Sequence, residues 1–346
     1  MRRGTAGKSS GFKYSGCPVR SLAACFTAPK TPLVVVERPL PAPGPGEARV
    51  AIEACGLGFG DWNTAMLDAL PRLPLVPGQE GAGVVEAVGA GASVAVGDRV
   101  AITPLAFACG ACGPCERGLE RACEQRRLTG LHVDGALATH GVFLAERLVP
   151  LAPGLDAAQA AVLAGSGWTA LGALRAAGVG AGLSLGVWGC GGVGHLAVQL
   201  ARALGAREVK VVDPDPSRRA LAESLGAQAF EALPPSSVDA AVLCTPSSQA
   251  AVQAVKAVRP TGAVVLAALT PAGRLDLPLA EVVGKGLRLQ GSFLGSRSDL
   301  QELLELAHTG RVFSAVESHP LEACPELLWR LRDGGFTGRL VVRMPR

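Results

Sequence analysis

The sequence predicts an α/β protein built from two domains. Its 346 residues are enough for two domains. Strand-like segments separated by turns fill the chain up to about residue 150, whereas strand-like and helix-like segments alternate from residue 156 onward. A glycine-rich turn directly follows one of the later strands and opens a helix. Regular strand–helix alternation predicts a doubly wound parallel sheet with right-handed crossovers.

The first half is interpreted as a β-rich domain. Runs of apolar and β-branched residues are separated by turn sequences such as "PAPGPGE", in which Gly and Pro favour reversals of the chain. The runs that predict strands are "TPLVVVERP", "GEARVAIEACG", "GAGVVEAVG" and "GDRVAIT". We therefore expect a β-rich domain over residues 21–155.

The second half has the pattern of a nucleotide-binding domain. The segment "DAAQAAVLAGSGWTALGALRAAG" has the Ala/Leu spacing of a helix and begins with Asp156 as a capping residue. Further helices are predicted at "HLAVQLARALGA", "SRRALAESLGA" and "QAAVQAVKAV", and strands at "LSLGVW", "EVKVVD", "DAAVLCT", "GAVVLAAL" and "LRLQGSF". We expect this domain over residues 156–294. A last helix, "DLQELLELAHTG", and a last strand, "GRLVVRM", then close the chain.

Composition limits the classes of partner. The formal charge of +4 and an aromatic content of 4% do not favour nucleic acid, but they suit a small anionic ligand such as a nucleotide or a coenzyme A ester. No apolar run approaches the roughly 20 residues that span a bilayer. Ten cysteines, four of them clustered, indicate a metal site plus free thiols and a cytoplasmic protein.

Residues 1–20, "MRRGTAGKSSGFKYSGCPVR", are predicted to be an N-terminal extension. They contain five Lys/Arg and no acidic residue. This composition resembles that of a transit peptide, although the apolar core of a secretory signal is missing. We interpret the segment as a short extension or an early start codon, with a transit peptide as the alternative.

The glycine-rich turn has the spacing of a dinucleotide-binding loop, with Gly189, Gly191 and Gly194 at its three positions and Gly192 and Val193 between them. The three glycines permit a tight turn, close approach of a pyrophosphate, and close packing of helix on strand. The helix amino end then offers N–H groups to phosphate.

An acidic residue follows this loop at the expected place. Asp213 stands 19 residues beyond Gly194 at the end of the next strand, where a carboxylate accepts ribose hydroxyls and repels a 2′-phosphate. This favours NAD(H), although Arg218 and Arg219 nearby keep NADP(H) open. A purely structural turn with a surface Asp is the remaining alternative.

Four cysteines form a second motif. Cys109, Cys112, Cys115 and Cys123 are spaced x2, x2 and x7 on a Gly/Pro-rich lobe, and four thiolates at such spacing suit tetrahedral zinc with no open position. Such a zinc is structural and contributes to folding. The alternatives are four free thiols, a disulfide cluster, or a zinc ribbon for nucleic acid.

These motifs, together with "PGQEGAGVVEAVGAGASVAVGDRV", occur in the order found in zinc-type alcohol dehydrogenases. The chain thus resembles the medium-chain dehydrogenase/reductase superfamily over residues 21–346. The resemblance implies a GroES-like catalytic domain, a Rossmann domain, and a return of the chain to the catalytic domain over residues 295–346. It also implies a homodimer through the sheet edge of the nucleotide domain, and an arginine near the pyrophosphate at Arg339.

The chain departs from this family at the catalytic zinc. Where members read similarly to Cys-His-Thr-Asp-x-His, this sequence has "GFGDWN", which places Gly58 at the first zinc-binding Cys. Gln79 stands at the His ligand in "PGQEGAG", followed by the retained Glu80. Gly165 stands at the second Cys ligand. One amide oxygen is a poor substitute for the N and S donors that zinc prefers.

The proton relay of the family is also missing. Gly60 replaces its Ser/Thr, Asn63 replaces its His, and Phe59 replaces a basic cofactor contact. Cys55 lies three residues before Gly58 and resembles a cysteine of the family that binds no zinc. The sequence therefore predicts no catalytic zinc, with a pseudo-enzyme as the alternative.

Loss of this zinc favours another reaction. Zinc acts as a Lewis acid on an alcohol or carbonyl oxygen, whereas reduction of a conjugated C=C bond spreads charge onto an enolate oxygen that a few donors can stabilise. We expect an NAD(P)H-dependent reductase of an activated C=C bond, in particular an α,β-unsaturated acyl-CoA. The narrower expectation is reduction of dimethylacryloyl-CoA in an alternative route to isovaleryl-CoA. The rivals are a zinc-independent alcohol dehydrogenase or carbonyl reductase, and a non-catalytic dinucleotide-binding protein.

The candidate catalytic residues surround the altered positions. The candidate donors are Gln79, Trp62, Asn63 and Thr169, and Asp61 and Glu80 are expected to orient them, to relay a proton, or to support the emptied pocket. Thr169 is also expected near the cofactor. We further expect the two glycines at the Cys positions to open space for a larger substrate.

Overall fold

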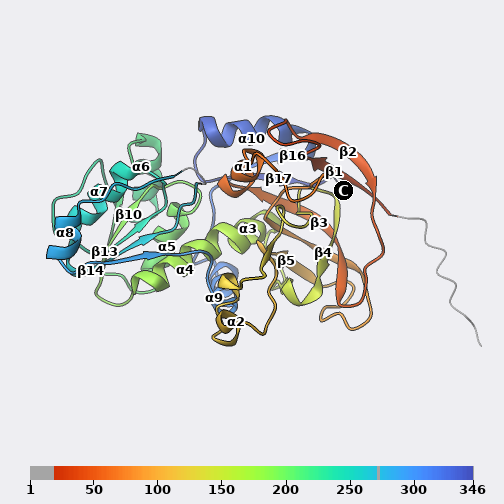
Figure 1. Ribbon diagram of the computed structural model, residues 1–346, viewed down its shortest axis with the longest axis horizontal. Helices are drawn as coiled ribbons and strands as arrows, with labels where there is room; N and C mark the ends of the chain where they lie inside the picture. Colours follow the sequence, from red (N-terminus) through yellow and green to blue (C-terminus); the bar gives the residue numbers. More distant parts are fainter. Residues whose placement is uncertain (1–18, 271–272, 346) are drawn as a thin grey trace, which may run out of the picture.

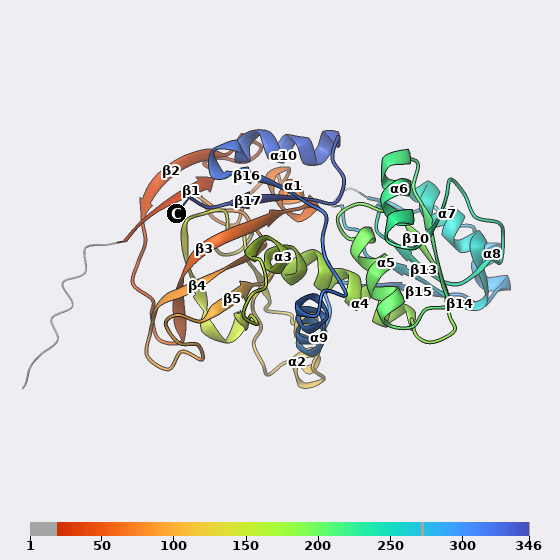
Figure 2. The same cartoon turned by 180° about the vertical axis from the view of Figure 1, so that it is seen from behind.

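The computed structural model describes residues 19–270 and 273–345, so residues 1–18 of the expected N-terminal extension lie outside it. Figure 1 shows a β-rich catalytic domain and a nucleotide-binding domain side by side, with helices α3, α4 and α9 between them. The same arrangement is seen from behind in Figure 2. The predicted α/β fold is confirmed, with both the β-rich and the parallel-sheet parts.

The catalytic domain is built on a mostly antiparallel seven-stranded sheet within the described ranges. Its strand order is β16-β17-β3-β4-β5-β9, and β8 also pairs with β3. The bounds are β3 (Glu47–Leu57), β4 (Glu80–Val88), β5 (Arg99–Ile102), β8 (His140–Leu144), β9 (Val149–Pro150), β16 (Val316–Pro320) and β17 (Arg339–Arg343). Two small antiparallel pairs flank it, β1 (Arg20–Cys25) with β2 (Val34–Pro39) and β6 (Leu105–Phe107) with β7 (Arg127–Leu128).

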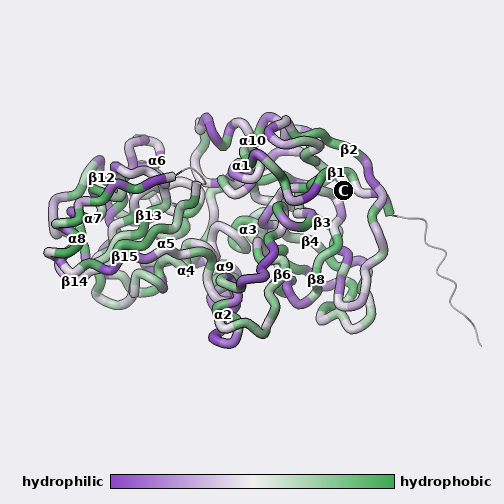
Figure 3. The backbone as a smooth tube through the Cα atoms, in the orientation of Figure 1, coloured by the Kyte–Doolittle hydropathy of each residue, from purple (hydrophilic) through white to green (hydrophobic). Residues whose placement is uncertain are grey.

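The nucleotide-binding domain contains a parallel sheet in the order β12-β11-β10-β13-β14-β15. Its strands are β10 (Ser184–Trp188), β11 (Glu208–Val212), β12 (Gln228–Phe230), β13 (Val238–Leu243), β14 (Val258–Leu266) and β15 (Arg288–Gly291). The helices of this domain are α5 (Gly194–Ala203), α6 (Pro216–Ser224), α7 (Ser248–Ala257) and α8 (Leu279–Gly284). Hydrophobic residues follow the central strands of this sheet (Figure 3), which is typical of parallel strands buried on both faces.

The segment predicted as one long helix is divided by a wider turn. It consists of α3 (Ala157–Val162), a π-helical turn over Leu163–Gly167, and α4 (Trp168–Ala177). Asp156 caps α3 by accepting the N–H groups of Ala158 and Gln159. Single π turns inside helices commonly occur at functional sites, and this one contains Gly165.

Several elements were not expected from the sequence. Among them are α1 (Phe59–Ala65), α8, α10 (Cys324–Asp333), β12 and β16, while α9 (Arg297–His308) occurs as predicted. The helix α10 buries Cys324, Leu327, Leu328 and Leu331 and packs next to α1. The cysteine lobe adds α2 (Gly113–Glu116) and a 3-10 turn over Glu120–Ala122, and further 3-10 turns cover Ala145–Arg147 and Leu321–Ala323.

Within the described ranges, none of the helices combines the length and the apolar character required to cross a bilayer.

Candidate active site

The glycine-rich turn has the geometry of a dinucleotide-binding loop. Gly189 has a φ of 90°, a conformation that L side chains rarely adopt. A Cβ at Gly194 would collide with the carbonyl of Gly189, so α5 starts directly against the strand end. A Cβ at Gly191 would meet only Arg218, at 4.0 Å, which leaves the loop open on that side. The turn therefore fits a pyrophosphate at the helix amino end.

Asp213 joins the end of β11 to this loop. One carboxylate oxygen accepts the N–H of Cys190 at 2.7 Å and the other accepts the N–H of Asp215 at 2.9 Å. The side chain is 1% exposed, so its position is fixed by backbone contacts. Because each carboxylate oxygen has a second lone pair, Asp213 can still accept a ribose hydroxyl.

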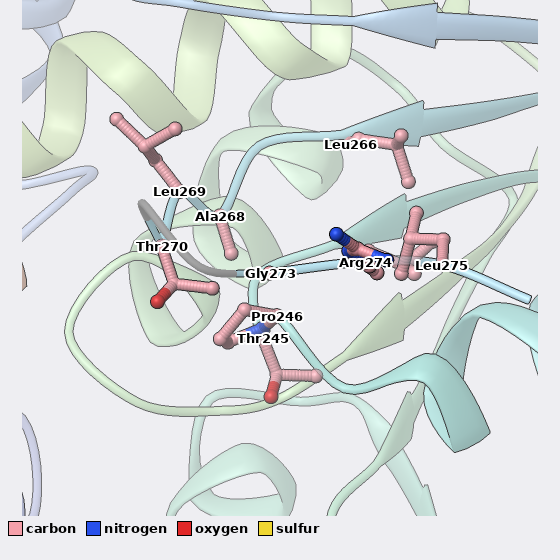
Figure 4. A pocket seen from close by; sticks show the side chains of 10 residues that line it. Thr245, Pro246, Leu266, Ala268, Leu269, Thr270, Gly273, Arg274 and Leu275 are labelled. Carbon is pink, nitrogen blue, oxygen red and sulfur yellow. The ribbon is translucent and has the colours of Figure 1, made fainter.

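A cavity of about 180 Å³ lies at the carboxyl ends of β13 and β14 (Figure 4). In open α/β sheets, ligands bind outside these strand ends. The lining includes Thr245, whose Cβ would lie 3.3 Å from a Cβ at Gly189, so the cavity adjoins the glycine-rich turn. The full lining is Leu243, Thr245, Pro246, Leu266, Ala268, Leu269, Thr270, Gly273, Arg274 and Leu275.

Across from this loop, Asp61 fixes the start of α1. Its carboxylate accepts the N–H of Gly58 at 3.0 Å and the N–H of Gly78 at 2.9 Å, and the side chain is 2% exposed. Burial raises the pKa of Asp61 to about 6, although these two N–H bonds act in the opposite direction. Asp61 therefore connects α1 to the segment that carries Gln79.

Glu80 and Arg339 form a buried ion pair at the base of the site. The second carboxylate oxygen of Glu80 accepts the N–H and the hydroxyl of Ser166, at 2.7 and 3.2 Å, in the π-helical turn. Burial raises the pKa of Glu80, and Arg339 partly offsets this rise. Three distant segments, β4, the π-helical turn and β17, thus meet at one carboxylate.

The space beside the three glycines is filled, so the expectation that Gly58 and Gly165 open room for substrate is wrong. A Cβ at Gly58 would lie 2.9 and 3.0 Å from the two Nη atoms of Arg339. A Cβ at Gly165 would collide with the Glu80 carboxylate, and one at Gly60 with the Gln79 amide oxygen. Long polar side chains occupy this volume, and the glycines make room for them.

The candidate donors differ in their placement. The half-buried Gln79 amide has no hydrogen-bond partner among the described residues, whereas the Thr169 hydroxyl donates to the Gly165 carbonyl at 2.9 Å. Asn63 donates from α1 to the carbonyl of Leu269 at 2.9 Å, next to the cavity. Gln79 is therefore the candidate whose amide is available to a ligand.

The predicted donor Trp62 and the nearby Trp168 of α4 both have structural contacts. The ring of Trp62 packs edge-on against Trp329 of α10, with ring centroids 5.3 Å apart, and Arg332 lies over both rings. Trp168 donates its indole N–H to the carbonyl of Ser296 at 2.6 Å. The indole N–H of Trp168 is therefore already bonded, whereas Trp62 stays a predicted donor.

A polar cluster that sequence reasoning missed lies behind the loop. His195, which directly follows Gly194, is fully buried, with Nδ1 2.9 Å from the Gly191 carbonyl and Nε2 3.1 Å from the Ser314 hydroxyl. Gln159 in turn bonds both main-chain groups of Ser314. The available signal was a histidine within an otherwise apolar helix start. Burial lowers the pKa of His195 to about 4, so the ring is neutral near pH 7.

The four lobe cysteines lie together as their spacing predicts. Their sulfur atoms are all within 4.8 Å of one another, and they form the one such group of His, Cys, Asp or Glu in the part of the chain that the structure describes. Backbone N–H groups lower the pKa of Cys112 to about 6 and also lower that of Cys123. Four converging sulfurs and N–H donors fit a tetrahedral thiolate metal site.

Comparison with known proteins agrees with both halves of the site. Residues 44–153 match the alcohol dehydrogenase GroES-like domain, and residues 192–309 match the zinc-binding dehydrogenase family. An alcohol dehydrogenase of Geobacillus stearothermophilus is 37% identical over 331 residues, covering 91% of this chain and 97% of that protein.

Two solved structures extend the comparison. A thermostable alcohol dehydrogenase from Pyrobaculum aerophilum, bound to cobalt and zinc, is 27% identical with a TM-score of 0.86, covering 94% of this chain and 100% of that chain. The crystal structure of AibC is 27% identical with a TM-score of 0.85, covering 99% of this chain and 100% of that chain. The chain belongs to the zinc-binding alcohol dehydrogenases of the medium-chain dehydrogenase/reductase superfamily, and it is an NAD(P)-dependent oxidoreductase.

Proposed function

We propose that this protein is an NAD(P)H-dependent reductase of an activated C=C bond and uses no catalytic zinc. The observation that carries this proposal is the filling of the altered site. Arg339 and Glu80 occupy the space into which side chains at Gly58 and Gly165 would project. A buried ion pair and a free Gln79 amide provide hydrogen-bond donors there in place of metal ligands.

The residues present do not fit a catalytic zinc. Of the three family ligand positions, two are glycines without a donor atom and the third, Gln79, offers one neutral amide oxygen. Zinc sites in proteins use Cys, His or carboxylate ligands, with three protein ligands in a catalytic site. The two carboxylates beside these positions are already engaged, Glu80 by Arg339 and Ser166 and Asp61 by two backbone N–H groups.

A metal-free site favours reduction of conjugated bonds. A dinucleotide held by its pyrophosphate at the glycine-rich turn would supply a hydride from its nicotinamide. Charge that develops on a carbonyl oxygen conjugated to the reacting carbon is delocalised, and a few preorganised donors stabilise it. Gln79 is positioned to donate one such hydrogen bond, while Asp61 holds α1 and the Gln79 segment in register.

The cofactor and the metal belong to the same proposal. Asp213 at the end of β11 supports NAD(H) as the preferred cofactor, because a 2′-phosphate would meet its carboxylate. Arg218 next to Gly191 is the feature that would favour NADP(H) instead. One structural zinc per chain on the four lobe cysteines is supported by their convergence. The substrate class we propose is an α,β-unsaturated acyl-CoA, with dimethylacryloyl-CoA as the specific candidate.

We also propose a homodimer through the edge of the nucleotide-binding sheet. All four residues of the edge strand β15 are exposed, which leaves a row of unpaired backbone groups. Leu279 and Val283 on the adjacent α8 are 73% and 76% exposed. A second copy pairing at β15 would cover both the strand edge and these side chains.

Carbonyl reduction is the second candidate, because the named relatives are alcohol dehydrogenases. Reduction of the C=C bond and reduction of the carbonyl group can be distinguished by the carbon atom that receives deuterium from the cofactor. The protein, treated with chelator, is given deuterated NADH or NADPH and a conjugated enone, an enoyl-CoA, or the matching saturated aldehyde. Deuterium at the β-carbon of the enone or the thioester supports the proposal. Deuterium at the carbonyl carbon with an intact C=C bond would assign the protein to the carbonyl reductases.

A further inference from the structure

The carbonyl of Gly191, in the middle of the glycine-rich turn, is bonded by His195. The backbone N–H of His195 lies 3.2 Å from this oxygen, and the ring Nδ1 lies 2.9 Å from it. The peptide bond between Gly191 and Gly192 is trans, so the carbonyl and the next N–H point in opposite directions. Because the carbonyl points along α5 to His195, the N–H of Gly192 points away from the helix, to the side where an anion binds.

This orientation leaves donors free at the start of α5. The N–H groups of Gly192, Val193 and Gly194 have no acceptor within residues 19–270 and 273–345. Free N–H groups at a helix amino end are the donors that bind a pyrophosphate. The contact between His195 and Gly191 therefore decides the direction in which the turn presents its donors.

The surroundings of the His195 ring fix its tautomer. A carbonyl oxygen only accepts, so Nδ1 carries the proton and donates to Gly191. Nε2 then has a lone pair and lies 3.1 Å from the hydroxyl of Ser314, which donates to it. A second acceptor near this hydroxyl, the carbonyl of Ala315 at 3.2 Å, already accepts the N–H of Arg339 at 2.8 Å. Burial lowers the pKa of His195 to about 4, so the ring keeps this neutral form near pH 7.

Ser314 lies in the irregular segment between α9 and β16 of the catalytic sheet. Both of its main-chain groups are paired with the side chain of Gln159 on α3, at 2.7 and 2.9 Å. Gln199, one turn after His195 on α5, pairs in the same way with the main chain of Phe313, at 2.8 and 3.1 Å. Helices on both sides thus hold neighbouring residues of this segment, and His195 extends the contact to the glycine-rich turn.

We propose that His195 is a positioning residue for the cofactor, which directs the pyrophosphate donors of the turn outward through Gly191 and keeps the turn in register with the catalytic sheet through Ser314. His195 touches neither cofactor nor substrate, and the proposal applies whichever bond the enzyme reduces. Its two ring nitrogens have separable tasks. The bond to Gly191 acts on the ADP half of the cofactor, which belongs at the turn and at Asp213. The bond to Ser314 acts on the nicotinamide half, which extends toward the catalytic domain.

The two tasks are separated by comparing the binding of ADP with the binding of NADH. ADP affinity is measured by calorimetry and NADH affinity by nicotinamide fluorescence, both on the full-length protein. Ser314→Ala removes only the second bond, so we expect unchanged ADP binding and NADH binding weakened about 3- to 10-fold, the range for one hydrogen bond. His195→Phe removes both bonds at similar volume, so ADP should bind about 3- to 10-fold more weakly and NADH more weakly still.

A conservative variant and a control identify the bond responsible. The amide N–H of an asparagine can take the place of Nδ1, whereas its side chain is too short to reach Ser314. His195→Asn should therefore restore ADP binding to the wild-type level and match Ser314→Ala for NADH. Leu200→Ala removes volume from the fully buried face of the same helix, and it should lower the melting temperature while leaving both affinities unchanged.

The tautomer provides a readout that does not require a His195 variant to fold. In protein labelled with 15N, the ring signals of His195 are identified as those that Ser314→Ala shifts. We expect a protonated Nδ1 and an unprotonated Nε2, and both signals should move when ADP is added. A protonated Nε2, or signals that ignore ADP, would overturn the proposal.

The affinities decide the same question independently. Unchanged ADP binding in folded His195→Phe, or an equal loss of ADP binding in Leu200→Ala, would show that His195 only fills the core. Unchanged NADH binding in Ser314→Ala would overturn the contact between the turn and the catalytic sheet.

Discussion

Asp61 shows how one buried carboxylate organises the residues of the site. It accepts two backbone N–H groups, one at each end of the gap between α1 and the Gln79 segment. The sequence identified Asp61 as a site residue that was expected to orient donors, to relay a proton or to support the emptied pocket. Its observed contacts are to backbone, because Gly58 directly precedes α1 and Gly78 lies just before β4, where no strand or helix satisfies their N–H groups.

Asp61 also predicts an unusual pH dependence of stability. Its pKa is raised from 3.8 to about 6, so the folded protein binds this proton more tightly than the unfolded chain does. Asp61 alone should therefore lower the free energy of unfolding by about 3 kcal/mol as the pH rises from about 4 to about 6. Replacing Asp61 with Asn should remove this decrease. Denaturant unfolding of both proteins between pH 4 and pH 7 measures it.

Asp215 is the control, because its pKa is shifted in the direction opposite to that of Asp61. Its hydrogen bonds from Ser217 lower its pKa, so its contribution is lost as the pH falls through that lowered pKa. Asp215→Asn should therefore leave the decrease between pH 4 and pH 6 intact. Equal slopes for the wild type and Asp61→Asn would show that Asp61 is not buried as described.

The residue scale also shows the limit of sequence reasoning. Gly58, Gln79 and Gly165 were recognised from local motifs, and their lack of zinc-binding atoms follows from residue type. The occupants of the freed space could not be predicted, because Arg339 is 259 residues from Glu80 in the chain. The two side chains come together because β17 and β4 both pair with β3.

At the scale of elements, the π-helical turn between α3 and α4 is the most informative departure from expectation. An apolar Ala/Leu pattern predicted one continuous helix, and the pattern is indeed continuous. Inserting a π turn over Leu163–Gly167 places the Ser166 N–H against Glu80. Tertiary bonding to a buried carboxylate thus decides the local helix geometry, which propensity alone does not encode.

The cysteine lobe is the element whose clustering could be predicted from the sequence spacing of its cysteines alone. Four thiols within one short segment converge because the intervening turns are tight, and the expected metal site needs few distant contacts. By contrast, α10 was missed, although it has ten residues like α5 and α7. Its stability depends on packing next to α1 and under the catalytic sheet.

Removing one lobe thiol should affect stability more than chemistry. We expect Cys112→Ser to bind less than one zinc per chain, to unfold at a lower temperature, and to be cleaved faster by protease within residues 109–126. The rate of hydride transfer in the folded fraction should stay within about 2-fold, because the lobe contributes no side chain to the site. Metal analysis, calorimetry and single-turnover kinetics measure these three quantities.

A second variant tests whether these effects come from loss of the metal site or from loss of any buried thiol. Cys25→Ser removes a buried thiol of the catalytic domain that lies outside the cluster, so its zinc content should equal that of the wild type. A Cys112→Ser protein with full zinc content and unchanged melting temperature would contradict the metal site on this lobe.

On the scale of the whole molecule, the two domains are connected by polar contacts as well as by helices. Asn63 reaches from α1 to Leu269 of the nucleotide-binding domain. Arg297 of α9, the helix that lies between the two domains, donates to the carbonyls of Glu146 and Leu148 in the catalytic domain. The alternation of strands and helices predicted both domains. The contacts between them were not predictable, because they depend on how the sheets face each other.

The exposed edge of the nucleotide-binding sheet predicts the assembly state. If β15 and α8 pair with a second copy, Val283→Glu should convert a dimer into a monomer in sedimentation experiments, because it places a charge within the apolar contact. Val96→Glu changes a valine that is 62% exposed in the catalytic domain, and it should leave the dimer intact. A monomeric wild type, or equal effects of both changes, would contradict this interface.

The central claim is that this member of a zinc-binding family reduces conjugated bonds with structural zinc alone. The most direct measurement determines zinc content and the rate of C=C reduction on the same sample, before and after dialysis against a chelator that leaves the lobe zinc in place. We predict one zinc per chain, a rate unchanged by the chelator, and no stimulation by added zinc. Two zincs per chain, or a rate that falls with the second zinc and returns when zinc is restored, would contradict the account.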